Sequence, residues 1–304
     1  MRDLKAPTIE KHLRDVDIPF ISTKHSHQGH FVPSIVRKYA SPKWIAQTFL
    51  KVGDRLFGSI IEMLKSYRNV KNNQYLGNKI IDKETLTQFE EYAKSLGIDK
   101  IGYTKVNPDY IFKDRKILFE NAIVLVMEMK RDKIDQAPSL ETNKEIFRTY
   151  HELGKVVNKL ASLLIELGFN AQAGPALGGD INYVMTACDA NLGMIGNHGL
   201  LITEEFGPSL RLAALYTDID NLPFTSNKDH EWILGYCKKC KMCVNKCPAG
   251  AIYNSPKDVE IGGKRNIDYK KCAVPFSNDY GCTLCVKHCA FYTGSYKQIK
   301  NSIV

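Results

Sequence analysis

Residues 237–248 read CKKCKMCVNKCP, and no other stretch of the chain is as informative about the fold. The four cysteines have the spacing C-x2-C-x2-C-x3-C and are followed by proline, which is typical of domains that hold two [4Fe–4S] clusters. Three thiolates on one tight loop reach three irons of a single cluster. The fourth, carried away by the turn before Pro248, ligates the other cluster. The spacing therefore predicts a ferredoxin-like domain in this part of the chain.

A second run of cysteines, with the spacing C-x9-C-x2-C-x3-C, supplies the other half of the ligands. We assign one cluster to Cys237, Cys240, Cys243 and Cys289, and the other to Cys247, Cys272, Cys282 and Cys285. Zinc sites also use Cys-x2-Cys pairs, but three cysteines at successive x2 spacing before Cys-Pro match the cluster pattern better. The second run is irregular and ends in Cys-Ala, so the assignments of Cys272 and Cys289 are the weaker ones.

Composition and charge limit the class of protein. The chain has 304 residues, enough for about two domains, and 44% hydrophobic and 25% charged residues exclude a disordered or low-complexity chain. No apolar run approaches the roughly 20 residues of a membrane span. The first residues show neither an apolar stretch behind their basic side chains nor a twin arginine, so we expect a cytoplasmic protein. The net charge is +9, and residues 1–78 carry 13 Lys and Arg against 6 Asp and Glu.

The pattern along the chain predicts three parts: a helical extension over residues 1–78, a body over 79–228 and the cysteine-rich domain over 229–304. In the extension, an apolar stripe predicts one strong helix that docks on the body, with a membrane-surface helix as the alternative. The stripe comprises Ile45, Phe49, Val52, Leu56, Ile60 and Leu64. Three histidines in HSHQGH, residues 25–30, lack cysteine or acidic neighbours, so we expect a solvated loop there rather than a metal site.

The body alternates helix and strand. We expect a helix over residues 86–96, strands from residue 100 and over 122–129, and a long helix over 146–167. A Gly- and Pro-rich loop, AQAGPALGGD at residues 171–180, then allows the backbone to approach a ligand closely. Two further strands begin at residues 199 and 210. The body is therefore α/β or α+β.

The segment NLGMIGNHGLLITEEFGPSLRLAALYTDI, residues 191–219, together with CKKCKMCVNKCPAGAI, closely resembles the core of the corrinoid iron–sulfur reductive dehalogenases. The related epoxyqueuosine reductases of tRNA modification show a similar order of motifs. The strand AIVLVMEM and the long helix match the same core, so the resemblance covers about residues 80–290.

This resemblance implies a nitroreductase-like α/β core that binds cobalamin base-off, followed by the two-cluster ferredoxin-like domain. The clusters would reduce the corrinoid cobalt for reductive cleavage of a small-molecule substrate. The chain has no DxHxxG motif, so a protein histidine in place of the lower base is not expected. The residues that the resemblance places at the cofactor are Gly178, Gly179, Gly196, Asn197, His198, Gly199 and Leu200.

Three residues are the catalytic candidates that the resemblance implies. Dehalogenases use a tyrosine as proton donor with a basic side chain beside it, and these roles fall on Tyr150 and Arg211. Tyr150 also lies on the apolar stripe of the long helix, so a core tyrosine is an equal interpretation. Ser209 stands where the family has a first basic residue, and glycines replace an expected asparagine near residue 178. Epoxyqueuosine reductases use an aspartate from this loop, and Asp180 is the nearest one; a loop-capping role is its structural alternative.

Three functions remain open from the sequence. The first is a cobalamin-dependent reductase of the dehalogenase type. The second is tRNA epoxyqueuosine reduction, and the third is a non-catalytic two-cluster electron-transfer protein. Four lysines among the first cluster ligands, with no acidic residue from residue 232 to 257, would steer an acidic low-potential donor such as ferredoxin or flavodoxin, or form a solvated surface.

Overall fold

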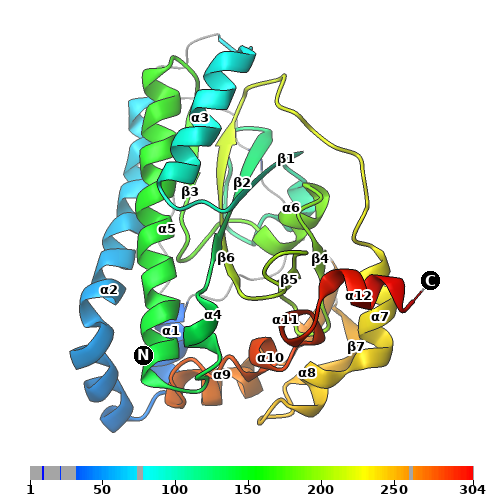
Figure 1. Cartoon of the computed structure of the whole chain (residues 1–304). Coiled ribbons are helices and arrows are strands. Elements are labelled where there is room, and N and C mark those ends of the chain that lie inside the picture. Colours follow the sequence, from blue (N-terminus) through cyan, green and yellow to red (C-terminus); the bar gives the residue numbers. More distant parts are fainter. Residues whose placement is uncertain (1–8, 10–20, 22–31, 74–77, 260–262, 304) are drawn as a thin grey trace.

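A four-stranded sheet lies at the centre of the molecule (Figure 1), in the order β1-β2-β6-β3 with every neighbouring pair antiparallel. Its strands are β1 (Lys100–Lys105), β2 (Asn121–Glu128), β3 (Ala171–Gly174) and β6 (Leu210–Thr217). The computed structural model describes residues 9, 21, 32–73, 78–259 and 263–303. The predicted mixed fold is confirmed, and the antiparallel pairing makes it α+β.

Both faces of strand β2 are buried. Ile123 and Leu125 belong to a hydrophobic cluster with Leu153 and Leu160 of α5 (Leu140–Glu166), whereas Val124 and Val126 pack with residues of α6 (Tyr183–Asp189). Because helices and loops cover both sides of the sheet, the strand is a continuous apolar run rather than an alternating one. Such runs are commoner in parallel sheets, which is why the sequence left the fold class open.

Most other elements of the body lie close to their predicted positions, but the predicted loop at residues 171–180 begins with strand β3, which pairs with β6. Helix α3 (Lys83–Ser95) starts at Asp82, whose carboxylate accepts a hydrogen bond of 2.9 Å from the backbone N–H of Thr85. The predicted strand at residue 199 is short: only β5 (Leu201–Ile202) forms, paired with β4 (Met194–Ile195). The body also contains η3 (Pro108–Tyr110) and α4 (Arg131–Ile134).

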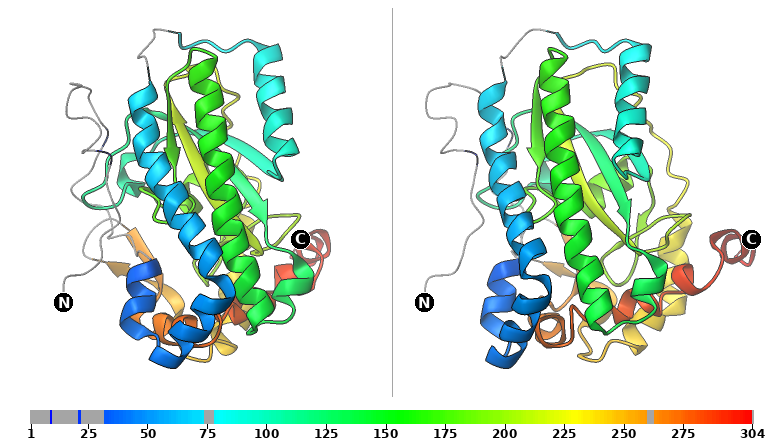
Figure 2. Two further views of the ribbon diagram at one scale, coloured as in Figure 1. Left: turned by 90° about the vertical axis from the view of Figure 1, so that its left-hand side faces the viewer. Right: turned by 60° about the vertical axis from the view of Figure 1, so that its left-hand side comes forward.

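The long N-terminal helix α2 (Pro42–Asn69) lies along α5 (Figure 2) and ends in the short helix η2 (Val70–Asn72). Of the predicted docking stripe, Val52 is fully buried, but Ile45, Phe49 and Leu64 are 39%, 50% and 37% exposed. The prediction that this stripe docks on the body was therefore only partly right. The two helices approach each other closely at Gly58 of α2, because an added Cβ there would lie 2.3 Å from the His151 ring of α5.

The cysteine-rich region folds against the lower end of the sheet in the view of Figure 1. Its elements are α7 (Trp232–Cys240), α8 (Met242–Asn245), β7 (Ile252–Val259), β8 (Gly263–Ile267), α9 (Tyr269–Asn278), α10 (Leu284–Lys287), α11 (Ala290–Thr293) and α12 (Tyr296–Asn301). The N-terminal helix α1 (Val32–Tyr39) reaches this region, because the Asn278 side chain donates to the Tyr39 carbonyl over 2.9 Å and accepts from the Ser41 N–H over 2.9 Å.

The histidines of HSHQGH lie outside the described residues, and the division at residues 78 and 228 stays a prediction. Within the part of the chain that the structure describes, no helix has both the length and the apolar character needed to cross a bilayer.

We predict that Gly207→Ala destabilises the contact between the body and the cysteine-rich region. Gly207 has a φ of +54°, and an added Cβ would lie 2.5 Å from the carbonyl oxygen of Phe291 in α11. Strain and overpacking should lower the free energy of unfolding by about 1–3 kcal/mol, measured by anaerobic chemical denaturation.

The matched control is Gly235→Ala. This helical glycine has open space at its Cβ, so alanine should stabilise by up to about 1 kcal/mol. Equal effects of the two substitutions would contradict the proposed close contact.

Candidate functional site

Four cysteines from two separate segments line one small cavity. Cys237 and Cys240 come from α7, and Cys243 follows after Lys241 turns the chain through a φ of +52°. Cys289 directly precedes α11. All four line the same cavity, together with Asn197 and His198. The structure thus brings together the residues assigned from the spacing to one cluster, although their role as ligands stays a prediction.

The other four cysteines also lie close to one another, because their thiols shift one another's pKa values. Burial and the neighbouring thiols of Cys282 and Cys247 raise the pKa of Cys272 to about 11. Burial also raises the pKa of Cys285, and the thiols of Cys272 and Cys282 add to the shift. The Cys243 thiol also raises the pKa of Cys285, so the two groups of thiols are neighbours. Thiols of this kind are protonated until a metal displaces the proton, so iron binding here would release protons.

The turn between β4 and β5 separates the thiol cavity from a second cavity. The Asn197 amide donates to the carbonyl of Cys237 over 2.8 Å. His198 is 4% exposed, and burial lowers its pKa to about 4. Its Nδ1 accepts from the Leu200 N–H over 3.1 Å, whereas Nε2 has no partner among the described residues. Of the predicted cofactor residues in this turn, Asn197 and His198 therefore face the thiols, and Leu200 lines the second cavity.

Gly196 and Gly199 belong to this turn, but neither lines the thiol cavity or the second cavity. The carbonyl of Gly196 accepts from the Asn266 side chain over 3.1 Å. Gly199 has a φ of +78°, a conformation that favours glycine. These two predicted cofactor residues shape the turn and do not line the second cavity.

The second cavity has a volume of about 270 Å³ and contains the predicted catalytic pair. Tyr150 of α5 and Arg211 of β6 both line it, and the Arg211 guanidinium carbon lies 3.8 Å above the centre of the Tyr150 ring. Arg211 Nε also donates to Thr149 over 3.5 Å. Gly178 and Gly179 also line this cavity. The remaining wall is mostly apolar, from residues such as Leu177, Ile181, Val184, Leu201, Pro208, Leu210 and Leu212.

Asp180 lies behind this wall rather than in it. Its side chain is 2% exposed and accepts a hydrogen bond of 3.1 Å from the Tyr67 hydroxyl. Arg115 Nη1 lies 3.4 Å from the same carboxylate oxygen, and the other oxygen has no partner among the described residues. Burial raises the pKa of Asp180 from the ordinary 3.8 to about 7, against the lowering effects of Arg115 and Tyr67.

The sequence analysis missed Arg115 and Tyr67. Arg115 lines the cavity and holds Asp180 from 65 positions away, and the Tyr67 hydroxyl also donates to the Gly178 carbonyl over 3.0 Å. No local motif surrounds either residue, so only their contacts in the fold reveal them.

Comparisons with known proteins agree with this architecture. Residues 230–253 match the family described as "4Fe-4S binding domain". A tetrachloroethene reductive dehalogenase of Desulfitobacterium hafniense is 31% identical over 213 residues, covering 64% of this chain and 37% of that protein. An epoxyqueuosine reductase of Bacillus subtilis is 25% identical over 250 residues, covering 67% and 62%. The resemblance found in the sequence is thereby confirmed.

A solved structure shares the fold. It is described as "Reductive dehalogenase structure suggests a mechanism for B12-dependent dehalogenation" and has a TM-score of 0.62 at 15% identity, covering 80% of this chain and 38% of that one. The chain thus spans well under half the length of the dehalogenases that it matches.

We predict a pH dependence of stability that arises from Asp180. The folded protein keeps the proton on Asp180 up to a pKa of about 7, whereas the unfolded chain loses it near 3.8. Between these values the unfolded state binds fewer protons, so stability relative to Asp180→Asn falls as pH rises and is constant above the folded pKa. The expected slope is about 1.4 kcal/mol per pH unit between pH 5 and 7, measured by denaturation of both proteins.

Asp82→Asn is the control. Hydrogen bonds from Thr85 lower the pKa of this exposed capping carboxylate. The difference in free energy of unfolding between Asp82→Asn and the native protein should therefore be constant over the same pH range. A constant difference for Asp180→Asn too would show that its carboxyl ionises normally.

Proposed function

We propose that this chain is a cobalamin-dependent iron–sulfur reductase that cleaves carbon–halogen bonds of small organic molecules. The observation that carries this proposal is the position of Tyr150 beneath Arg211 in a cavity one turn away from a cavity lined by four cysteines. Reductive dehalogenation needs a proton donor, a cation that stabilises negative charge and a path for electrons. The name of the Desulfitobacterium relative supports this reaction class.

The walls of the second cavity suit a corrinoid. They are mostly apolar, and Gly178 and Gly179 contribute backbone rather than side chains, with the Tyr183 ring packed against Gly179. A volume of about 270 Å³ is at the low end for ligand pockets, so it would hold the reacting part of a large cofactor rather than the whole of it. We infer that this cavity would bind cobalamin in the base-off form, and the B12-dependent protein that shares this fold supports the inference. When bound, cobalamin would supply a reducible cobalt centre for cleavage of the carbon–halogen bond.

The protein's own residues would then control the proton. Replacing a carbon-bound halogen by hydrogen needs two electrons and one proton, and it releases a halide ion. The Tyr150 hydroxyl would give the proton to carbon. The Arg211 guanidinium on the ring face would stabilise the phenolate that remains, because a cation is attracted to the electron-rich face of an aromatic ring. The apolar wall would exclude water that competes as a proton source.

Two [4Fe–4S] clusters would deliver the electrons, one on each group of four cysteines. The match to the 4Fe-4S binding domain supports clusters over zinc. Lys238, Lys239 and Lys246 are exposed beside these cysteines, so an acidic ferredoxin or flavodoxin is the proposed donor.

Epoxyqueuosine reduction on tRNA is the second candidate, favoured by the Bacillus relative. Asp180 argues against it, because a carboxyl held behind the wall by Tyr67 and Arg115 does not reach the cavity.

The two-cluster assignment makes a prediction about iron. Anaerobically reconstituted protein should contain about eight irons per chain. Cys240→Ala and Cys285→Ala should each lose about half of them, because each removes a ligand of a different cluster. Cys188→Ala, in α6, should retain all of them. Two zincs with almost no iron would contradict the assignment.

The catalytic proposal predicts that the protein binds hydroxocobalamin, with an electron paramagnetic resonance signal of base-off cobalt after reduction. Tyr150→Phe should bind it equally well but lower kcat on tetrachloroethene or a halogenated phenol about 10²–10⁴-fold, since the proton donor is lost. Tyr103→Phe is the control, because its hydroxyl contacts Glu90 away from the cavity.

Three outcomes would decide against the proposal. Absence of cobalamin binding would favour the electron-transfer protein. Activity on epoxyqueuosine tRNA alone would favour the second candidate. Unchanged kcat in Tyr150→Phe would remove Tyr150 from the mechanism.

A further inference from the structure

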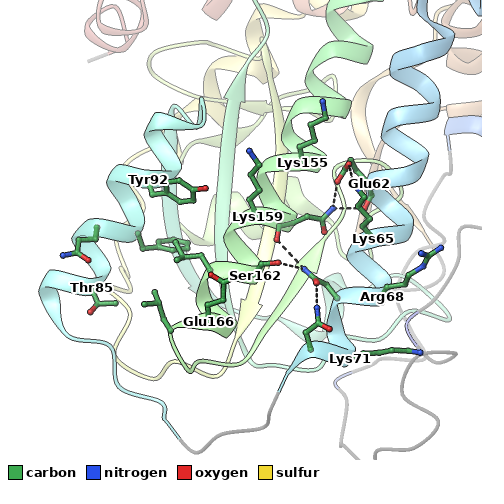
Figure 3. A pocket seen from close by; sticks show the side chains of 17 residues that line it. Glu62, Lys65, Arg68, Lys71, Thr85, Tyr92, Lys155, Lys159, Ser162 and Glu166 are labelled. Atoms are coloured by element: carbon green, nitrogen blue, oxygen red, sulfur yellow. Dashed lines mark hydrogen bonds and ion pairs between the residues drawn. The ribbon is translucent and has the colours of Figure 1, made fainter.

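A groove far from the cysteines lies between α2, α3 and α5 (Figure 3). Its volume is about 1120 Å³, the largest of the cavities described here. In Figure 1, α3 stands at the opposite end of the molecule from α7 to α12, so the groove belongs neither to the thiol cavity nor to the cavity of Tyr150. The groove is therefore a separate place from the proposed reaction site.

Positive charge dominates the groove. Five of its lining residues are basic (Lys65, Arg68, Lys71, Lys155 and Lys159), and two are acidic (Glu62 and Glu166). Lys65 pairs with Glu62 over 2.8 Å, which uses one acid. Within the described ranges, Arg68, Lys71, Lys155 and Lys159 make no ion pair.

The spacing of these cations is unfavourable without an anion. Lys155 and Lys159 are four residues apart on α5, and Arg68 at the end of α2 and Lys71 in η2 are three residues apart. Like charges at such spacing repel each other and destabilise a helix slightly. An anion with several negative charges would relieve this repulsion.

Part of the groove is aromatic and apolar. Tyr92 of α3 is 41% exposed and Leu167 at the end of α5 is 42% exposed, whereas Thr85 and Gln88 of α3 add polar side chains. Figure 3 places Tyr92 on one side and Lys65 on the other, with Lys155 and Lys159 between them. A ring system could therefore lie on Tyr92 while a charged tail reaches the lysines.

The floor of the groove is held in place by hydrogen bonds. The Asn158 amide donates to the Glu62 carboxylate over 3.0 Å, and its oxygen accepts from Ser66 over 2.9 Å. Asn69 donates to Ser162 over 3.2 Å. Because these polar groups already satisfy one another, the groove is preformed, and the cations on its rim are left for a ligand.

We propose that this groove binds a nucleotide with at least two phosphates. Its base would stack on Tyr92, and its phosphates would contact Lys155 and Lys159 of α5, with Arg68 and Lys71 nearby in the same groove. The concave shape and the volume suit a small molecule. The combination of an aromatic face with several cations selects a nucleotide over a simple inorganic anion.

The test is calorimetric titration of the cluster-loaded full-length protein with ATP and, separately, with inorganic tripolyphosphate. Lys155→Ala/Lys159→Ala should weaken binding of both at least tenfold. Tyr92→Leu should weaken ATP at least fivefold and leave tripolyphosphate within twofold. Lys83→Ala/Lys94→Ala, which removes the same charge from exposed positions of α3 outside the groove, should change either affinity less than twofold.

Each other outcome overturns the proposal. ATP that does not bind at millimolar concentration excludes a nucleotide. Equal losses in both lysine double variants show non-specific attraction, and equal losses of ATP and tripolyphosphate in Tyr92→Leu show a phosphate site without base recognition. Binding of tRNA but not ATP, lost in Lys155→Ala/Lys159→Ala, identifies a nucleic-acid surface instead. Iron content and circular dichroism check folding, and Arg68→Gln/Lys71→Gln gives a second test of the cations.

Discussion

The turn at residues 196–200 is the wall between the two cavities, and the arrangement of the site depends on it. On one side Asn197 holds the backbone of Cys237 by a hydrogen bond of 2.8 Å, and on the other Leu200 lines the cavity of Tyr150 and Arg211. Because one short turn serves both cavities, the cysteine-rich region cannot shift without moving the wall of the second cavity. The contact of Gly207 with α11 adds a second point of attachment.

The two arginines that line the second cavity have different partners. Arg211 lies over an aromatic ring at the open cavity, where its charge is available to a reacting group. Arg115 is turned toward a buried carboxyl, whose pKa burial nevertheless raises to about 7. Both arginines line this cavity, but Arg115 also pairs with the buried Asp180. This difference is the physical basis for preferring Tyr150 over Asp180 as proton donor.

Most of the fold could be predicted from the sequence, because apolar periodicity reports which faces are buried. The helices α3 and α5 and the strands β1, β2 and β6 follow from that pattern. Helix α2 was predicted too, but the prediction of which of its side chains are buried was partly wrong. Periodicity identifies apolar faces, whereas α2 meets α5 through Gly58 and a set of hydrogen-bonded polar side chains.

The spacing of the cysteines alone was enough to indicate an iron–sulfur domain, because ligands that share one tight loop must be close in any fold. The motif order likewise indicated Tyr150 and Arg211. Only the tertiary structure decided that Arg211 stacks on Tyr150 at 3.8 Å. It also decided that Asp180 lies behind the wall, held by Arg115 and Tyr67. These contacts join residues 61 to 113 positions apart, and no local pattern of charge or hydrophobicity encodes which of many distant side chains will meet.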